Sequence, residues 1–175
     1  MTSIGCPGRP KRGLPPYKPI DRRLMGIRRL PQDFKEFLRL LTGHGVEYLL
    51  IGGYAVGYHG YPRTTADMDV WVANNRENAR KLVEVFMEFG MNSPEITPEL
   101  FMKPGNIIRM GVPPVRIEVL NEIDGADFQD CSLHAITDDI DGVGVRLISL
   151  ADLRRNKKAS GRYKDLDDLE HLPEP

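Results

Sequence analysis

Residues 46–72, VEYLLIGGYAVGYHGYPRTTADMDVWV, decide the fold of this chain. A short apolar run ends at Gly52 and Gly53, and a second apolar run opens with Asp67 and Asp69. A strand that ends in two glycines and leads into a helix offers backbone N–H groups to an anion. A strand that begins Asp-x-Asp places both carboxylates on one face, because side chains alternate with a period of two. The stretch therefore predicts a phosphate-binding turn that faces a place for divalent cations.

Each half of this pattern also has an ordinary structural explanation. A glycine doublet after a strand is usually a tight turn, and Asp-x-Asp at the mouth of a strand is a weak signal alone. Here the two occur together, separated by the thirteen residues 54–66, and a third acid follows in a later strand-like run, Ile117-Glu118-Val119. The combination favours a nucleotide-handling site over two unrelated turns.

Glu118 needs a partner, because a charge flanked by apolar residues in a strand is costly when it is buried unpaired. A salt bridge to Arg109 or Arg116 would satisfy it. A metal ion shared with Asp67 and Asp69 would satisfy it as well, and the rest of the pattern favours the metal.

The three pieces together resemble the nucleotidyltransferase superfamily that is built on the palm of DNA polymerase beta. Its pattern, hG[GS] followed by Dh[DE]h and later by h[DE]h, matches Ile51-Gly52-Gly53, Asp67-Met68-Asp69-Val70 and Ile117-Glu118-Val119. Further matches are Ala55, His59-Gly60, Arg63, Thr65, Asn156-Lys157, Gly161-Arg162 and Lys164-Asp165. These look like the small prokaryotic branch of minimal nucleotidyltransferases and AbiEii-like toxins. The resemblance covers roughly residues 30–172.

The resemblance implies an α+β, palm-like fold with a mixed sheet of about five strands and helices packed mainly on one face. The expected helices cover residues 31–42, 54–59, 76–89, a short segment from 98, a segment from 149, and 162–172. The expected strands cover residues 46–51, 68–72, 107–110, 115–120 and 143–148. The acidic residues 138–142 are expected to form a solvated turn.

Two-metal chemistry gives the acids their expected roles. Two Mg²⁺ ions, or Mn²⁺ in their place, can activate an attacking hydroxyl and stabilise the departing pyrophosphate. Asp67 and Asp69 are expected to bridge both ions, and Glu118 to hold the ion at the acceptor hydroxyl. Relatives in this branch commonly have Asp where this chain has Glu118.

The nucleotide phosphates are assigned to a second set of residues. Gly52 and Gly53 are expected to bind them through backbone N–H groups, with Arg63, Thr65, Lys157 and Arg162 as further nucleotide-binding side chains. His59 could orient a phosphate or Asp67, or could simply be a buried histidine at a helix end. Asp165 could order Lys157 or Arg162 instead of contacting the substrate.

The resemblance implies an enzyme that moves NMP from an NTP to an acceptor hydroxyl. The acceptor would be an RNA 3′ end, tRNA above all, or a protein side chain, and the protein could be the toxin of a toxin–antitoxin pair with a cognate antitoxin as partner. A catalytically inactive nucleotide-binding or interaction module of the same fold is the alternative. A small-molecule acceptor is a weaker option, because the chain is short of a second domain that would close over it.

Length and composition fit a single domain. At 175 residues, with 41% apolar and 28% charged residues, the chain is ordinary for a globular protein. Residues 1–24 are rich in Pro, Gly and basic residues and are expected to be a disordered basic tail before one domain at 25–175. Cys6 and Cys131 form no disulfide framework or zinc pattern. No apolar run could span a membrane and no secretory signal is visible, so a cytoplasmic location is expected.

Overall fold

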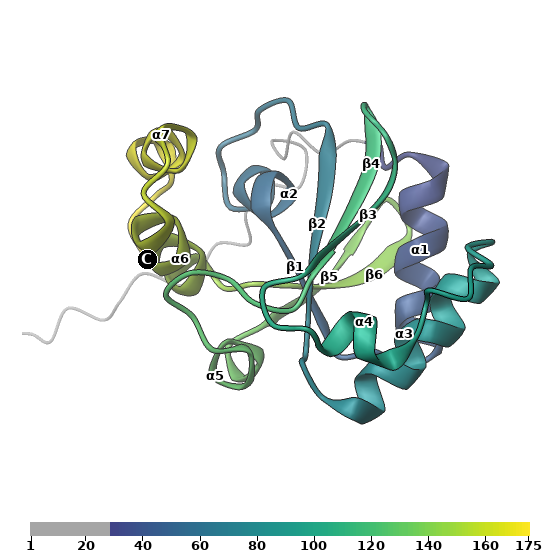
Figure 1. Cartoon of the computed structure of the whole chain (residues 1–175). Coiled ribbons are helices and arrows are strands. Elements are labelled where there is room, and N and C mark those ends of the chain that lie inside the picture. The colour runs from purple at the N-terminus through teal and green to yellow at the C-terminus, as the bar shows by residue number, and fades with distance from the viewer. Residues whose placement is uncertain (1–28) are drawn as a thin grey trace, which may run out of the picture.

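A computed structural model describes residues 29–175, so the expected tail at residues 1–24 lies outside the described part of the chain. The centre of the molecule is a six-stranded mixed sheet with the strand order β3-β4-β2-β1-β6-β5. Figure 1 shows the sheet between two groups of helices. The strands are β1 (Tyr48–Ile51), β2 (Asp67–Val72), β3 (Ile107–Val112), β4 (Val115–Leu120), β5 (Ile136–Ile140) and β6 (Val143–Leu147).

Seven helices connect and cover these strands within the described residues. They are α1 (Gln32–Gly43), α2 (Gly52–Tyr58), α3 (Arg76–Glu88), α4 (Pro98–Met102), α5 (Phe128–Leu133), α6 (Leu150–Ser160) and α7 (Tyr163–His171). Within residues 29–175, none of the helices combines the length and the apolar character needed to cross a bilayer.

Strand register brings the two ends of the signature stretch together. β1 pairs antiparallel with β2, so that Ile51 lies opposite Asp69. β2 in turn pairs parallel with β4, which places Asp69 beside Glu118. The end of β1, the start of β2 and the middle of β4 therefore meet at one place on the sheet.

The larger core lies between the sheet and α1, α3 and α4. Alternate residues of the strands point into this layer, among them the buried Leu50 and Val70. On the helices, Phe37 is fully buried and makes edge-to-face ring contacts with Phe86 and Phe89, with ring centroids 5.8 and 5.2 Å apart. The amphipathic stripes expected on α1 and α3 supply this layer.

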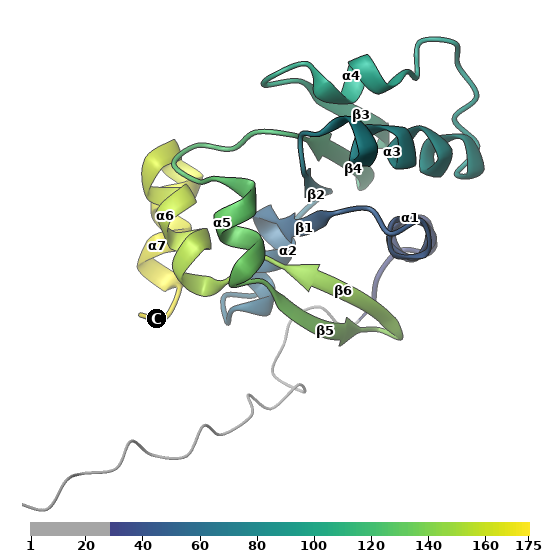
Figure 2. The same ribbon diagram turned by 90° about the horizontal axis from the view of Figure 1, so that it is seen from below.

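A second, smaller core covers the opposite face of the sheet. It contains Leu49 of β1 and Trp71 of β2, packed with residues of α2, α5 and α6 such as Phe128 and Leu153. Figure 2, seen from below, shows α5, α6 and α7 on one side of the sheet and α1, α3 and α4 on the other. β1 is buried on both faces, which explains its unbroken apolar sequence.

The predicted α+β fold is confirmed, with two corrections in detail. The helices cover both faces of the sheet, because the sheet's second face also carries large apolar side chains that need cover. The sheet has six strands and not about five. Residues 138–140, which were expected in an acidic turn, belong to β5 and pair with β6. Only Asp141 and Gly142 form the connection, both with positive φ of 53° and 79°. An Asp-Gly pair of this kind suits a two-residue hairpin turn.

The ring cluster in the larger core gives a test of the packing. We expect Phe37→Ala to lower the free energy of unfolding by about 3–5 kcal/mol, because it leaves a cavity beside Phe86 and Phe89. Urea denaturation followed by circular dichroism measures this. Met87→Ala, at a side chain that is 54% exposed on the same helix as Phe86, should change stability by no more than about 0.5 kcal/mol. Equal losses in the two variants would contradict the assignment of this core.

Candidate active site

A cavity of about 810 Å³ opens where β1, β2 and β4 face α6 and the start of α7. Its volume lies within the range of small-molecule sites. All nine residues predicted for the site line it: Gly52, Gly53, Arg63, Thr65, Asp67, Asp69, Glu118, Lys157 and Arg162. The structure thus brings residues from both halves of the chain into one place.

The glycine doublet forms the tight junction between β1 and α2. Gly52 has φ of +61°, and a Cβ atom at this position would overlap the carboxylate of Asp69. A Cβ atom at Gly53 would lie only 2.6 Å from Oγ1 of Thr65. Both positions therefore require glycine, since a larger residue would displace the groups that line the cavity.

The three predicted acids point into the cavity from adjacent strands, together with an arginine. On β4, Arg116 lies opposite Asp67, and Glu118 lies opposite Asp69. Nη2 of Arg116 donates to Oδ2 of Asp67 at 2.8 Å and lies 3.1 Å from Oε1 of Glu118. Nε of Arg109, on β3, donates to the same Oε1 at 2.9 Å. Both salt bridges that the sequence left open for Glu118 are therefore formed.

The acids at the strand ends nevertheless carry an excess of negative charge. Burial, with the neighbouring charges of Glu118 and Asp67, raises the pKa of Asp69 to about 6. Oδ1 of Asp67 is buried and has no hydrogen-bond partner among the described residues. These two features fit a divalent cation, because hard carboxylate oxygens are the ligands that Mg²⁺ prefers. Within residues 29–175, no three Asp, Glu, His or Cys side chains are gathered as a preformed metal site.

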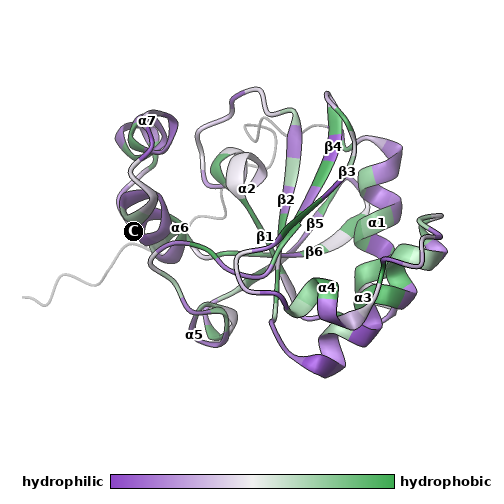
Figure 3. Ribbon diagram, viewed as in Figure 1, coloured by the Kyte–Doolittle hydropathy of each residue, from purple (hydrophilic) through white to green (hydrophobic). Residues whose placement is uncertain are grey.

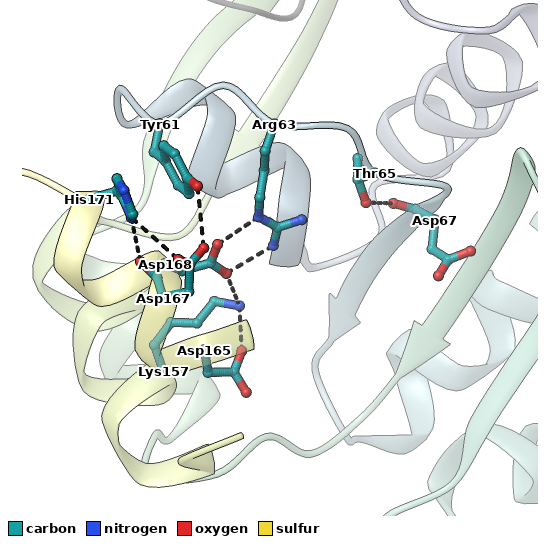
Figure 4. Close-up of polar contacts among 9 residues, drawn as sticks. All are labelled: Tyr61, Arg63, Thr65, Asp67, Lys157, Asp165, Asp167, Asp168 and His171. Carbon is teal, nitrogen blue, oxygen red and sulfur yellow. Dashed lines mark hydrogen bonds and ion pairs between the residues drawn. The ribbon is translucent and has the colours of Figure 1, made fainter. Parts of the chain in front are cut away.

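A buried ion network lies across the cavity from these acids (Figure 4). Nζ of Lys157 contacts Oδ1 of Asp165 at 2.6 Å and Oδ2 of Asp168 at 2.8 Å. Arg63 binds both oxygens of Asp168, through Nε at 2.6 Å and Nη2 at 2.8 Å. Burial alone would raise the pKa of Asp165 and Asp168, but hydrogen bonds from their basic partners, with Lys157 common to both, outweigh it and keep each pKa below its ordinary value.

This network ties three parts of the chain together. Lys157 belongs to α6, Asp165 and Asp168 to α7, and Arg63 to the segment between α2 and β2. Figure 3 shows α6 and α7 as largely hydrophilic, unlike β1. Ion pairs therefore connect α7 to α6 and to the segment before β2. The side chain of Arg162 is 79% exposed, and its Nε lies 2.8 Å from Oδ2 of Asp165.

Two other sequence interpretations concern side chains near the cavity. Nε2 of His59 donates to the carbonyl oxygen of Ile148 at 2.8 Å, and burial lowers the pKa of the imidazole. His59 therefore links the end of α2 to Ile148, the residue after β6, and is not among the residues that line the cavity. Oγ1 of Thr65 donates to the backbone carbonyl of Asp67 at 3.1 Å, so it braces the start of β2 as well as lining the cavity.

Three functional candidates were not on the list predicted from sequence. Arg116 was considered only as a salt-bridge partner, although its alternation with Glu118 on one strand face places both in the cavity. Lys164 lines the cavity and lowers the pKa of Asp69 by its positive charge. Asp168 follows Asp165 at the i, i+3 spacing of a helix, a signal that two acids share one face.

Comparisons with known proteins identify a family and a similar fold. The profile of the family described as "Nucleotidyl transferase of unknown function (DUF2204)" matches residues 31–174. The fold is similar to that of a candidate nucleotidyltransferase from Thermotoga maritima, with a TM-score of 0.54, 15% identity, and coverage of 78% of this chain and 88% of that one. A nucleotidyltransferase-like antigenic protein from Paracoccidioides brasiliensis aligns with a TM-score of 0.48 and 17% identity over 88% of this chain and 77% of that one. No curated protein matches the sequence.

The buried network gives a prediction about stability. We expect Asp168→Ala to cost about 3–5 kcal/mol of unfolding free energy, because it leaves Arg63 without its partner and Lys157 with one of two. Asp167→Ala is the matched control, since this neighbouring side chain is 53% exposed and exposed ion pairs contribute up to about 1 kcal/mol. Chemical denaturation at pH 7 measures both. A loss in Asp168→Ala no larger than in the control would show that the network does not stabilise the fold.

The raised pKa of Asp69 gives a prediction about pH. Because this carboxyl group binds its proton more tightly in the folded state, its contribution to the free energy of unfolding falls as pH rises from about 4 to about 6, then stays constant. Asp69→Asn removes this titration. Its stability gain over the wild type should therefore grow across that window and level off above it, at up to about 3 kcal/mol.

Urea unfolding in EDTA between pH 4 and 8 measures this gain, since a bound cation would lower the pKa of Asp69. Asp33→Asn, at an exposed residue of α1, should show no such dependence. A gain for Asp69→Asn that is independent of pH would contradict the assigned environment.

Proposed function

The chain belongs to the nucleotidyl transferase family DUF2204, and we propose that it is a Mg²⁺-dependent enzyme that transfers NMP from an NTP to an acceptor hydroxyl. One observation carries the proposal. A single cavity joins the carboxylates of Asp67 and Asp69 at the start of β2, and of Glu118 on β4, to basic side chains from α6, α7 and the segment before β2. Nucleotidyl transfer needs this combination, because it depends on positioning and on charge neutralisation around phosphorus.

In the proposed reaction, the oxygen of the acceptor hydroxyl attacks the α-phosphorus of the NTP. A new O–P bond forms, the bond between the α-phosphorus and the bridging oxygen to the β-phosphate breaks, and pyrophosphate leaves with that bonding pair. The hydroxyl proton is released to solvent. Bound Mg²⁺ would lower the pKa of the attacking hydroxyl and neutralise charge on the phosphates.

The residues of the cavity divide this work between them. Asp67 and Asp69 would hold the cation, as the unpaired Oδ1 of Asp67 and the raised pKa of Asp69 support. Gly52 and Gly53 allow the backbone of the β1–α2 junction to line the cavity without side chains, so that phosphate oxygens can approach its N–H groups.

The basic side chains would bind the β- and γ-phosphates. Arg63 and Lys157 are oriented by Asp165 and Asp168, and both line the cavity. Lys164 and the exposed Arg162 lie at the same cavity and can reorient toward a polyanion. The ion network therefore acts as a positioning device for the phosphate-binding groups.

An RNA 3′ end, with tRNA as the leading candidate, or a protein side chain is the proposed acceptor. Transfer to an essential RNA would make the protein a toxin, and a cognate antitoxin would then be its partner. The alternative is a non-catalytic module whose cavity binds NTP but transfers no NMP. The presence of all the acids, both glycines and the basic residues supports the enzyme, because a module that only binds would not need them all.

A labelling experiment tests the proposal. Full-length protein with Mg²⁺ and each of the four α-labelled NTPs is incubated with tRNA, with total RNA, or alone. We expect label on one acceptor from one NTP. Asp67→Asn and Asp69→Asn should each reduce the rate by at least ~100-fold, the scale of losing one electrostatic group of an active site.

Asp33→Asn serves as the control, since it removes an exposed carboxylate on α1. It should leave transfer unchanged. Transfer that survives in both active-site variants would overturn the roles given to Asp67 and Asp69. Tight NTP binding without transfer to any acceptor would favour the non-catalytic module.

A further inference from the structure

Arg116 occupies the space between two of the three carboxylates expected to bind metal ions. Its Nη2 lies 2.8 Å from Oδ2 of Asp67 and 3.1 Å from Oε1 of Glu118. Strand register fixes this position, because Arg116 lies opposite Asp67 and two residues before Glu118 on the same face of β4. A metal ion held jointly by Asp67 and Glu118 would have to share this space with the guanidinium.

Two of the carboxylate oxygens at the site have arginine partners. Oε1 of Glu118 accepts from Arg109 and contacts Arg116, and Oδ2 of Asp67 accepts from Arg116. Oδ1 of Asp67 is buried and has no partner in the described part of the chain. This oxygen and the carboxylate of Asp69, which faces Glu118 across the strand pair, remain as donors for a metal ion.

The guanidinium is a cation of a different kind from a metal ion. Arginine keeps its charge at any pH that a protein tolerates, and its planar group can serve two acids at once. Three carboxylates at the site face two arginines, which leaves one negative charge. A single divalent ion more than compensates this remaining charge. A second divalent ion beside Arg116 would add like charge at close range.

We propose that Arg116 is a permanent cation of the active site that takes the place of one of the two metal ions. The site then binds a single divalent ion, on Asp67 and Asp69. Glu118 is a partner of the arginines in this arrangement and not a metal ligand. The inference rests on the proposed function, because it concerns the same cation site.

Mn²⁺ binding to the full-length protein tests the proposal without measuring activity. Free Mn²⁺ is counted by electron paramagnetic resonance during a titration. We expect the wild type to bind one ion. Arg116→Ala should bind a second ion as well, with an affinity at least about tenfold higher than that of any second ion for the wild type, since one unit of opposing charge is removed. Arg116→Lys, which keeps the charge, should still bind one ion. Arg76→Ala, at an exposed arginine of α3, is the control and should match the wild type.

Glu118→Gln gives an independent reading should Arg116→Ala fail to fold, as thermal unfolding would reveal. If Glu118 is not a ligand, this variant should still hold one ion on Asp67 and Asp69, with affinity weakened by no more than about tenfold through the loss of one neighbouring charge. A metal ligand lost at this position would weaken binding by more than about 100-fold, beyond the range for the loss of an outer partner.

The outcomes separate this inference from the proposed function. Two ions with equal affinities in the wild type and Arg116→Ala would overturn the role of Arg116 and leave a cation-dependent enzyme standing. One ion in both proteins, with the same affinity, would overturn it too. No Mn²⁺ bound to either protein would overturn the cation site itself, and the inference with it.

Discussion

The cavity depends on how the charge of carboxylates crowded on adjacent parallel strands is balanced. The pairing of β2 with β4 places Asp67, Asp69 and Glu118 on one side of the sheet, and burial makes their mutual repulsion costly. Gly52 adds to the crowding, because its lack of a side chain lets Asp69 approach the backbone closely. Cations must therefore be supplied, by the protein or by a ligand.

The protein balances charge differently on the two sides of the cavity. Asp165 and Asp168 are matched within the fold by Lys157 and Arg63, at nitrogen–oxygen distances of 2.6–2.8 Å and with almost no exposure of the acids. This side is fixed, and it connects α7 to the rest of the domain. At the strand ends, Oδ1 of Asp67 is buried without a partner among the described residues, and burial and neighbouring acids raise the pKa of Asp69. Under the proposed function, this is the side where exchangeable ligands would bind.

Much of this arrangement could be predicted from the sequence, because local signals fix strands, helices and the residues that share a face. The spacing between Gly52 and Asp69 indicated the β1–α2–β2 unit, and the residues predicted for the site meet in one cavity. The sequence also suggested the partners of Glu118 and Asp165, and these salt bridges are formed. The pairing of Arg63 with Asp168 could not be predicted, because the two residues are far apart in sequence and only tertiary packing brings them together. β5 was missed because its Asp138 and Asp139 obscured the alternation of a strand.

The choice of glutamate for the third acid, Glu118, is related to the presence of Arg116 beside it. Glu118 lies directly opposite Arg109 on β3 and beside Arg116 on its own strand. One carboxylate oxygen meets both guanidinium groups, at 2.9 and 3.1 Å. The shorter side chain of Asp would hold the carboxylate nearer the backbone and farther from Arg109. A glutamate at this position therefore suits a site in which arginines, together with the cation proposed for Asp67 and Asp69, carry the positive charge.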